Sequence, residues 1–217
     1  MLWSVVPKGV KSYSLSTRIG LPVKLKKHGH VAVLITPTAY VPPSLPCPAL
    51  TIDGLCSIHA SKPLRCLTMP FYPYREESDQ SDLLKPRSNW ECDTSFAAPL
   101  VYHNRSIVDR SNFDKERLSL LDQSATMAQY AEYMMKYNPS ITDRLALLAI
   151  RPDGNLITSL SSFLNTNKHL DAKHIATQQL SVLENFALKT AKIPELAEYN
   201  KNYSGWAMEM RFITKSL

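Results

Sequence analysis

Apolar residues recur at helical spacing through the second half of the chain. Ser111 or Asn112 is a suitable N-cap, and Asp114 and Glu116 place negative charge near the positive end of the helix that would follow. Asn138-Pro139 ends this helix, because proline disfavours helical backbone at the residue before it. The apolar positions expected on its buried face are Leu118, Leu121, Ala125, Ala128 and Met135.

The same period predicts three more helices. One begins near Ser140, runs through Ile150, and is followed by a turn at Asp153-Gly154. The next is expected around Leu156, Leu160, Phe163 and Leu164, and the last over 172–190.

The first half of the chain has a different pattern, set by proline. Twelve of the fifteen prolines fall within residues 1–99, so loops, turns and short strands are expected there. Residues 12–18 and 31–36 are the best strand candidates, and the second is rich in β-branched residues. The whole is an α+β protein, in which an irregular, short-stranded lobe (1–108) precedes a mostly helical lobe (109–217), whether as two units or as one integrated domain.

Composition indicates an ordinary globular protein, since hydrophobic residues make up 44% and charged residues 20% of the 217 residues. No apolar run approaches the length of a membrane span, and Pro7, Lys8, Gly9 and Lys11 interrupt any signal-peptide core. We therefore expect a cytoplasmic protein without membrane contact.

The net charge of +6 is unevenly distributed. Residues 1–52 carry six basic side chains and no acidic one: Lys8, Lys11, Arg18, Lys24, Lys26 and Lys27. Such a segment can attract the phosphates of nucleic acid or an acidic protein surface, although a solvated positive face is the favoured explanation.

Candidate chemistry is concentrated in four cysteines, Cys47, Cys56, Cys66 and Cys92. In a reducing compartment they are more typical of metal ligands, catalytic groups or inert core positions than of disulfides. Asp53-Gly54 predicts a tight reversal between Cys47 and Cys56, and Pro63 and Pro70 restrict the backbone around Cys66. Four thiolates suit a tetrahedral zinc ion or a [4Fe–4S] cluster, but the gaps of eight, nine and 25 residues contain no paired knuckle. Spacing alone leaves buried, unliganded cysteines as an equal alternative.

The residues around the cysteines resemble the YkgJ-like (CxxCxxCC) cysteine-cluster family, whose members are described as zinc- or iron-chelating. Family members typically carry C-x-F-L, then G-x-C-x-I-Y, R-P-x-x-C and P-F. The matching positions here are Cys47, Leu50, Gly54, Cys56, Ile58, Lys62-Pro63, Cys66 and Pro70-Phe71, with Cys92 as the later cysteine. The resemblance implies that Cys47, Cys56, Cys66 and Cys92 hold a metal. The family's earlier cysteine cluster is missing, because residues 1–46 contain no cysteine.

Three neighbouring side chains are candidates for an alternative ligand or for groups that support the ligands from behind. His59 stands where the family has tyrosine, as in the related region of flagellin lysine methylases, and is either an alternative ligand or a hydrogen-bond donor to a thiolate. Lys62 and Arg65 place positive charge beside Cys66, which would offset a tetrathiolate site, or they are simply solvated. Met69, Phe71 and Trp90 are expected to shield such a site from solvent.

Two functional hypotheses follow. The first is a metalloprotein, with [4Fe–4S] favoured slightly over zinc because wide gaps suit a larger cluster, in a redox or protein-modifying accessory role. The second is a non-catalytic protein, stapled by zinc, that binds a protein or nucleic-acid partner. The sequence contains no glycine-rich phosphate loop, HExxH or GxSxG motif, and it does not decide whether the chain is an enzyme.

Overall fold

The protein combines a small antiparallel sheet with seven α-helices in the part of the chain that the computed structural model describes, residues 1–26, 28–86, 92–150 and 156–216. The sheet contains β1 (Leu2–Pro7), β2 (Leu21–Leu25), β3 (Gly29–Thr36) and β6 (Leu156–Ile157), in the order β2-β3-β1-β6. β1 pairs with β3 from Leu2 opposite Thr36 to Pro7 opposite Val31. The α+β class is therefore confirmed.

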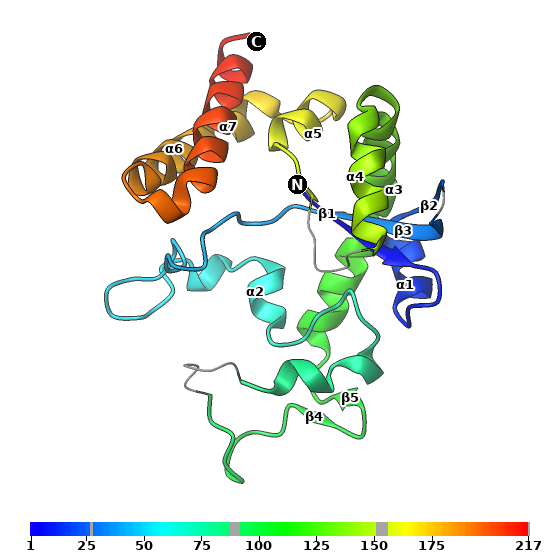
Figure 1. Ribbon diagram of the computed structural model, residues 1–217. Helices are drawn as coiled ribbons and strands as arrows, with labels where there is room; N and C mark the ends of the chain where they lie inside the picture. The colour runs from blue at the N-terminus through cyan, green and yellow to red at the C-terminus, as the bar shows by residue number, and fades with distance from the viewer. Residues whose placement is uncertain (27, 87–91, 151–155, 217) are drawn as a thin grey trace.

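One face of the sheet is covered by two helices, α3 (Ser111–Tyr137) and α4 (Pro139–Ile150), as Figure 1 shows. Alternate residues of the strands point toward them, so Trp3, Val31 and Val33 are almost completely buried. The Trp3 indole donates a hydrogen bond to Thr158 Oγ1 (2.9 Å), which also lies 3.1 Å from the Tyr130 hydroxyl of α3. This contact ties the first strand to the helical half.

The other face of the sheet is covered by α1 (Tyr13–Ile19), which lies where the sequence predicts a strand. That prediction was wrong, because Leu15 and Ile19 are one helical turn apart and pack together against Leu34 of β3. Gly20 allows this approach: a Cβ at that position would lie 2.4 Å from the Val33 carbonyl oxygen.

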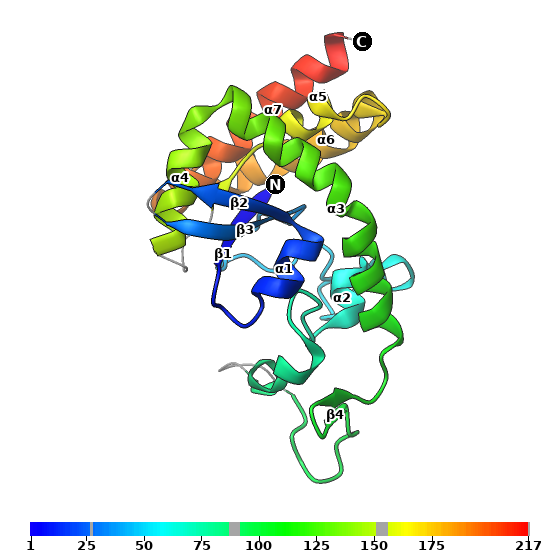
Figure 2. The ribbon, with the colours of Figure 1, turned by 90° about the vertical axis from the view of Figure 1, so that its right-hand side faces the viewer.

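The predicted strand at 31–36 is confirmed as part of β3. The predicted helices are confirmed as α3, α4, α5 (Leu160–Thr166) and α6 (Ala172–Thr190), except that Leu156 belongs to β6. The turn predicted at Asp153-Gly154 lies outside the described residues. A further helix, α7 (Ala197–Ser216), follows a short 3-10 turn, Pro194–Leu196, and packs antiparallel to α6. Figure 1 shows this pair to one side of the sheet, and Figure 2 shows the long α3 running from it toward α2.

The predicted buried face of α3 is confirmed only in part. Leu121 and Met135 are partly buried and pack against core residues, but Leu118 is 59% exposed and Ala125 is exposed. The fully buried residues of the helix are Phe113, Glu116, Met127, Tyr130 and Ala131. The helix crosses two packing regions, one against α1 and one against the sheet, and the buried stripe turns with it.

The long segment between β3 and α3 contains most of the short elements. It holds α2 (Leu64–Thr68), the small strands β4 (Tyr102–His103) and β5 (Ser106–Ile107), and 3-10 turns at His59–Ser61, Glu77–Asp79 and Ser81–Leu84. The division of the chain near residue 108 stays a prediction, but β6 from the second half pairs with β1 from the first.

Candidate functional site

Cys47 and Cys56 lie on a short hairpin, which we call the cysteine hairpin (residues 47–58). Gly54 has a φ of +76°, a left-handed conformation that glycine adopts without steric cost, and this forms the reversal expected at Asp53-Gly54. The Thr51 amide donates to the Leu55 carbonyl (2.8 Å) and the Ser57 amide donates to the Ala49 carbonyl (2.8 Å). Cys47 is exposed and Cys56 is half-buried.

Cys66 lies in the middle of α2, on its solvent-exposed side. The helix begins after Pro63 and packs through Thr68, which is 2% exposed and whose hydroxyl donates to the carbonyl oxygens of Leu64 and Asn112. Packing through Thr68 leaves the Cys66 thiol exposed. Cys92 is also exposed, and it immediately precedes a tight turn in which the Asp93 carboxylate accepts from the Ser95 amide.

All four cysteines are free, and none belongs to the hydrophobic core. Their chemistry fits a thiolate-bound metal. Their placement does not assemble one: across the described residues, no group of three or more histidine, cysteine, aspartate or glutamate side chains is placed to hold an ion. The four-cysteine site therefore stays a prediction.

The side chains expected to support the site have separate positions. His59 is exposed at the start of a 3-10 turn, and its backbone amide donates to the Cys56 carbonyl (3.2 Å). Lys62 is half-buried, and no ion pair joins it to another described residue. Met69 is 54% exposed, Phe71 is buried with Ile107 and Phe113, and Trp90 lies outside the described residues.

Arg65 has the most contacts of the predicted residues. Its guanidinium lies 3.4 Å from both carboxylate oxygens of Glu116, donates to the Phe71 carbonyl, and stacks 5.0 Å from the centre of the Tyr72 ring. Glu116 is buried on α3, so this contact joins α2 to the long helix. Part of the positive charge beside Cys66 is thus already balanced.

Two structural contacts around this segment had no clear signal in the sequence. Gln80 is fully buried; its amide nitrogen donates to the carbonyl oxygens of Tyr72, Arg75 and Glu76, and its oxygen accepts from the Tyr72 amide. Tyr40 lies at the start of the segment and packs against α7. The contacts of Gln80 are local, with backbone groups four to eight residues away, whereas Tyr40 meets Asn202 and Tyr203, which only the fold brings close.

An apolar hollow lies beside α2. Its volume is about 200 Å³, and its walls include Leu67, Met69, Phe71, Leu100 and Phe113. The cysteine hairpin also carries exposed apolar side chains, of which Ile52 and Leu55 are the most exposed, at 103% and 69%. Apolar surface is therefore concentrated near three of the four thiols.

Comparison with protein-family models, with curated proteins and with solved structures gives no match for this chain. Among the described residues, no helix is both long and apolar enough to cross a lipid bilayer.

Proposed function

We propose that this protein binds a metal through the thiolates of Cys47, Cys56, Cys66 and Cys92 and acts through that centre as an accessory to a protein partner. The observation that carries the proposal is that none of these cysteines is buried in the core and none is in a disulfide. Cysteine is among the residue types most often buried, so four free cysteines outside the core argue against inert packing positions.

The ligands come from the cysteine hairpin, α2 and the turn at residues 92–95, a stretch built mostly of turns and short helices. Segments with little regular structure can be ordered by the ligand they bind, as small metal domains are. Metal binding would therefore be coupled to the folding of residues 47–95.

Of the two metal types, we favour [4Fe–4S], because a cluster spans more widely spaced thiols than a single ion does. Anaerobically prepared protein is expected to contain about four irons per chain, the content of one cubane, with the visible absorbance of thiolate-bound iron. Replacing Cys66→Ser should abolish incorporation, because serine is nearly the same size but is a poor ligand for iron.

The matched control is His59→Ala, in the same segment. Retention of iron in this variant would leave His59 outside the ligand set, whereas loss equal to that of Cys66→Ser would place it inside. One zinc and no iron after anaerobic reconstitution would overturn the choice of cluster. Neither metal, at stoichiometric amounts, would overturn the metal centre itself.

A second candidate is a zinc-stapled protein without catalytic activity, and the exposed apolar residues of the cysteine hairpin favour it. Exposed apolar side chains next to one another are typical of protein-binding surfaces. In this case zinc removal by a chelator should lower the melting temperature and weaken binding to the partner together. The basic residues 8–26 give no comparable support for nucleic acid, since they are distributed over several elements and Lys11 is paired with Asp79. Lys8 and Lys11 lie between β1 and α1, Arg18 lies in α1, and Lys24 and Lys26 lie in and just after β2.

A further inference from the structure

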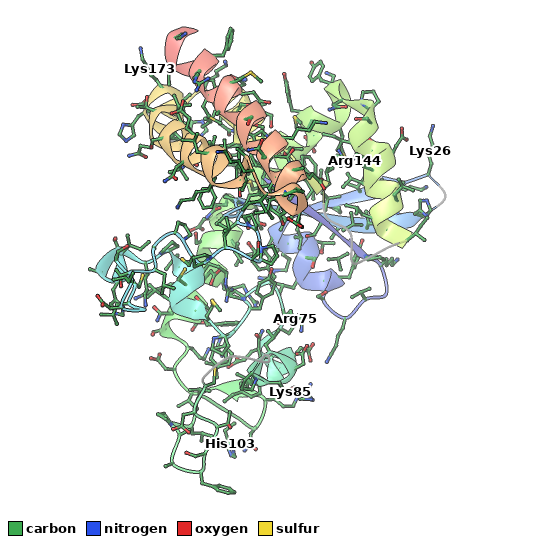
Figure 3. All side chains as sticks on the ribbon, turned by 60° about the vertical axis from the view of Figure 1, so that its left-hand side comes forward. Lys26, Arg75, Lys85, His103, Arg144 and Lys173 are labelled. Carbon is green, nitrogen blue, oxygen red and sulfur yellow. The ribbon has the colours of Figure 1, made fainter. Side chains whose placement is uncertain are left out.

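A second hollow lies far from the cysteines, where the end of α5, the start of α6 and the end of α7 meet. Figure 3 labels Lys173 at this end of α6. The hollow has a volume of about 440 Å³, within the range of small-molecule sites, which is roughly 300–1,000 Å³. Leu164 and Ile213, which are buried, and Leu170, which is partly buried, give it an apolar floor.

Two lysine side chains lie at the rim of this hollow. Lys168 and Lys173 are exposed, and neither forms an ion pair with another described residue. The one carboxylate of the lining belongs to Asp171, and its Oδ1 accepts a hydrogen bond from the His174 amide (2.9 Å) as the N-cap of α6. The rim therefore carries net positive charge next to the positive end of a 19-residue helix.

Asn167 supplies a fixed hydrogen-bond acceptor. It is only 7% exposed, and its amide nitrogen donates to the Phe163 carbonyl (2.8 Å) and to Thr166 Oγ1 (3.0 Å). The Phe163 carbonyl can only accept, so the amide cannot be turned over. Asn167 lines the hollow, and its Oδ1 accepts no hydrogen bond from the described residues.

We propose that this hollow binds a small organic monoanion that has a flat apolar ring system, a carboxylate and one N–H or O–H donor. The ring lies on Leu164, Leu170 and Ile213, the carboxylate lies between Lys168 and Lys173, and the donor meets Asn167 Oδ1. This site is independent of the metal centre and does not rest on the function proposed above.

The test uses three probes that differ in one group each. Indole-3-acetate has the ring, the anion and the N–H; naphthalene-1-acetate lacks the N–H; and tryptamine replaces the anion with a cation. Ligand-detected saturation-transfer NMR on the full chain should give a dissociation constant below about 1 mM for indole-3-acetate. Naphthalene-1-acetate should bind with an affinity at least about threefold lower, because one hydrogen bond is lost. Tryptamine should not bind measurably.

Substitutions at the hollow test whether the ligand binds there. Ala172→Trp should fill it and remove binding, with circular dichroism and the melting temperature as checks on folding. The exposed pair Lys168→Ala/Lys173→Ala should weaken binding about two- to tenfold without affecting the fold, whereas Lys201→Ala, an exposed lysine elsewhere, should not change it. The proposal fails if indole-3-acetate shows no saturation transfer, if tryptamine binds with an affinity equal to that of indole-3-acetate, or if the Lys168→Ala/Lys173→Ala variant binds indole-3-acetate as tightly as the parent does.

Discussion

Arg65 shows how a charged residue beside a cysteine can serve the fold. Its contacts with the Glu116 carboxylate, the Phe71 carbonyl and the Tyr72 ring hold α2 against α3. Removing only the cation leaves a buried carboxylate without its partner, which costs more than the pair itself contributes.

Arg65→Ala is expected to lower the free energy of unfolding by about 1–3 kcal/mol, measured by urea denaturation. Arg65→Ala/Glu116→Gln should recover part of that loss, because the unpaired charge is gone. The control is Arg75→Ala, whose partner Asp82 is 63% exposed, and it should change stability by no more than about 0.5 kcal/mol. Equal effects at Arg65 and Arg75 would contradict a structural role for the buried pair.

Tyr203 gives a residue-level prediction for alkaline pH. Burial raises the pKa of Tyr203 to about 12, from an ordinary value of 10.0, and its hydroxyl donates to the Tyr40 carbonyl. Because the folded-state pKa is raised, folding favours the neutral phenol. That stabilisation is fully present below pH 10 and is lost as the pH rises toward 12.

Tyr203→Phe removes both the hydrogen bond and the titration. Near pH 8 it should be less stable than the parent by about 0.5–1.5 kcal/mol, the usual net value of one hydrogen bond. Between pH 10 and 12 the difference should shrink, because only the parent loses the stabilisation of a neutral phenol at position 203, whereas Tyr74 and Tyr130, whose pKa burial also raises, titrate in both proteins. A difference that stays constant across this range, measured by chemical denaturation, would refute the assignment.

The loop between α2 and the second 3-10 turn is organised around one side chain. Gln80 makes four hydrogen bonds to the backbone of residues 72–76, and this replaces the regular pairing that the loop lacks. Gln80→Ala and Gln80→Glu should both lower stability by about 1–3 kcal/mol, since glutamate cannot donate to the three carbonyl oxygens.

The matched control for the loop is Gln123→Ala on the exposed side of α3, where the amide donates to the Ser119 hydroxyl and has no other hydrogen bond to a described residue. This variant should stay within about 0.5 kcal/mol of the parent. A tolerated Gln80→Glu would show that the loop is held by other contacts.

Helices were the elements best predicted from the sequence, because the apolar period and the proline stop are local signals. Their predicted N-caps were wrong, since Arg110 precedes α3 and Ser140 lies within α4. Asn138-Pro139 separates α3 from α4, and the apolar period over 172–190 coincides with α6. The buried face of α3 was predicted only in part: Leu121 and Met135 pack against the core, but the burial of Glu116 beside Arg65, 51 residues away, has no local signal. The strand predicted at 12–18 failed for a related reason: Leu15 and Ile19 suit either structure until Leu34 packs against them.

The candidate site was predicted less completely than the fold. The reversal at Asp53-Gly54 is local and was predicted, because glycine at a positive φ specifies it. The relative positions of α2, the cysteine hairpin and the turn after Cys92 depend on tertiary contacts such as those of Tyr40 and Arg65. No spacing of cysteines encodes those contacts.

The molecule as a whole has two main packing centres connected by few residues. The larger lies between the sheet and α3 and α4, and the smaller lies between α5, α6 and α7. Leu160 and Leu170 contact both. A second connection is made by Tyr40, which follows β3 and packs among Tyr199, Tyr203 and Trp206, with ring centres 4.7, 5.7 and 5.1 Å away.

Tyr40 therefore links the sheet, the cysteine hairpin that follows it, and the helix pair α6–α7. Tyr40→Ala keeps the backbone carbonyl that accepts from Tyr203 but removes the ring contacts, which should destabilise this connection by about 1–3 kcal/mol. Native-state hydrogen exchange should then show amides of α6 and α7 exchanging at least about tenfold faster, while those of β1 and β3 keep their protection.

The control is Tyr137→Ala. Tyr137 lies at the end of α3 and is 63% exposed, so this variant should leave the exchange of both sets of amides unchanged. If β1 and β3 lose as much protection as α7 in Tyr40→Ala, the two packing centres open as one cooperative unit, and Tyr40 is part of a single core rather than a connection between two.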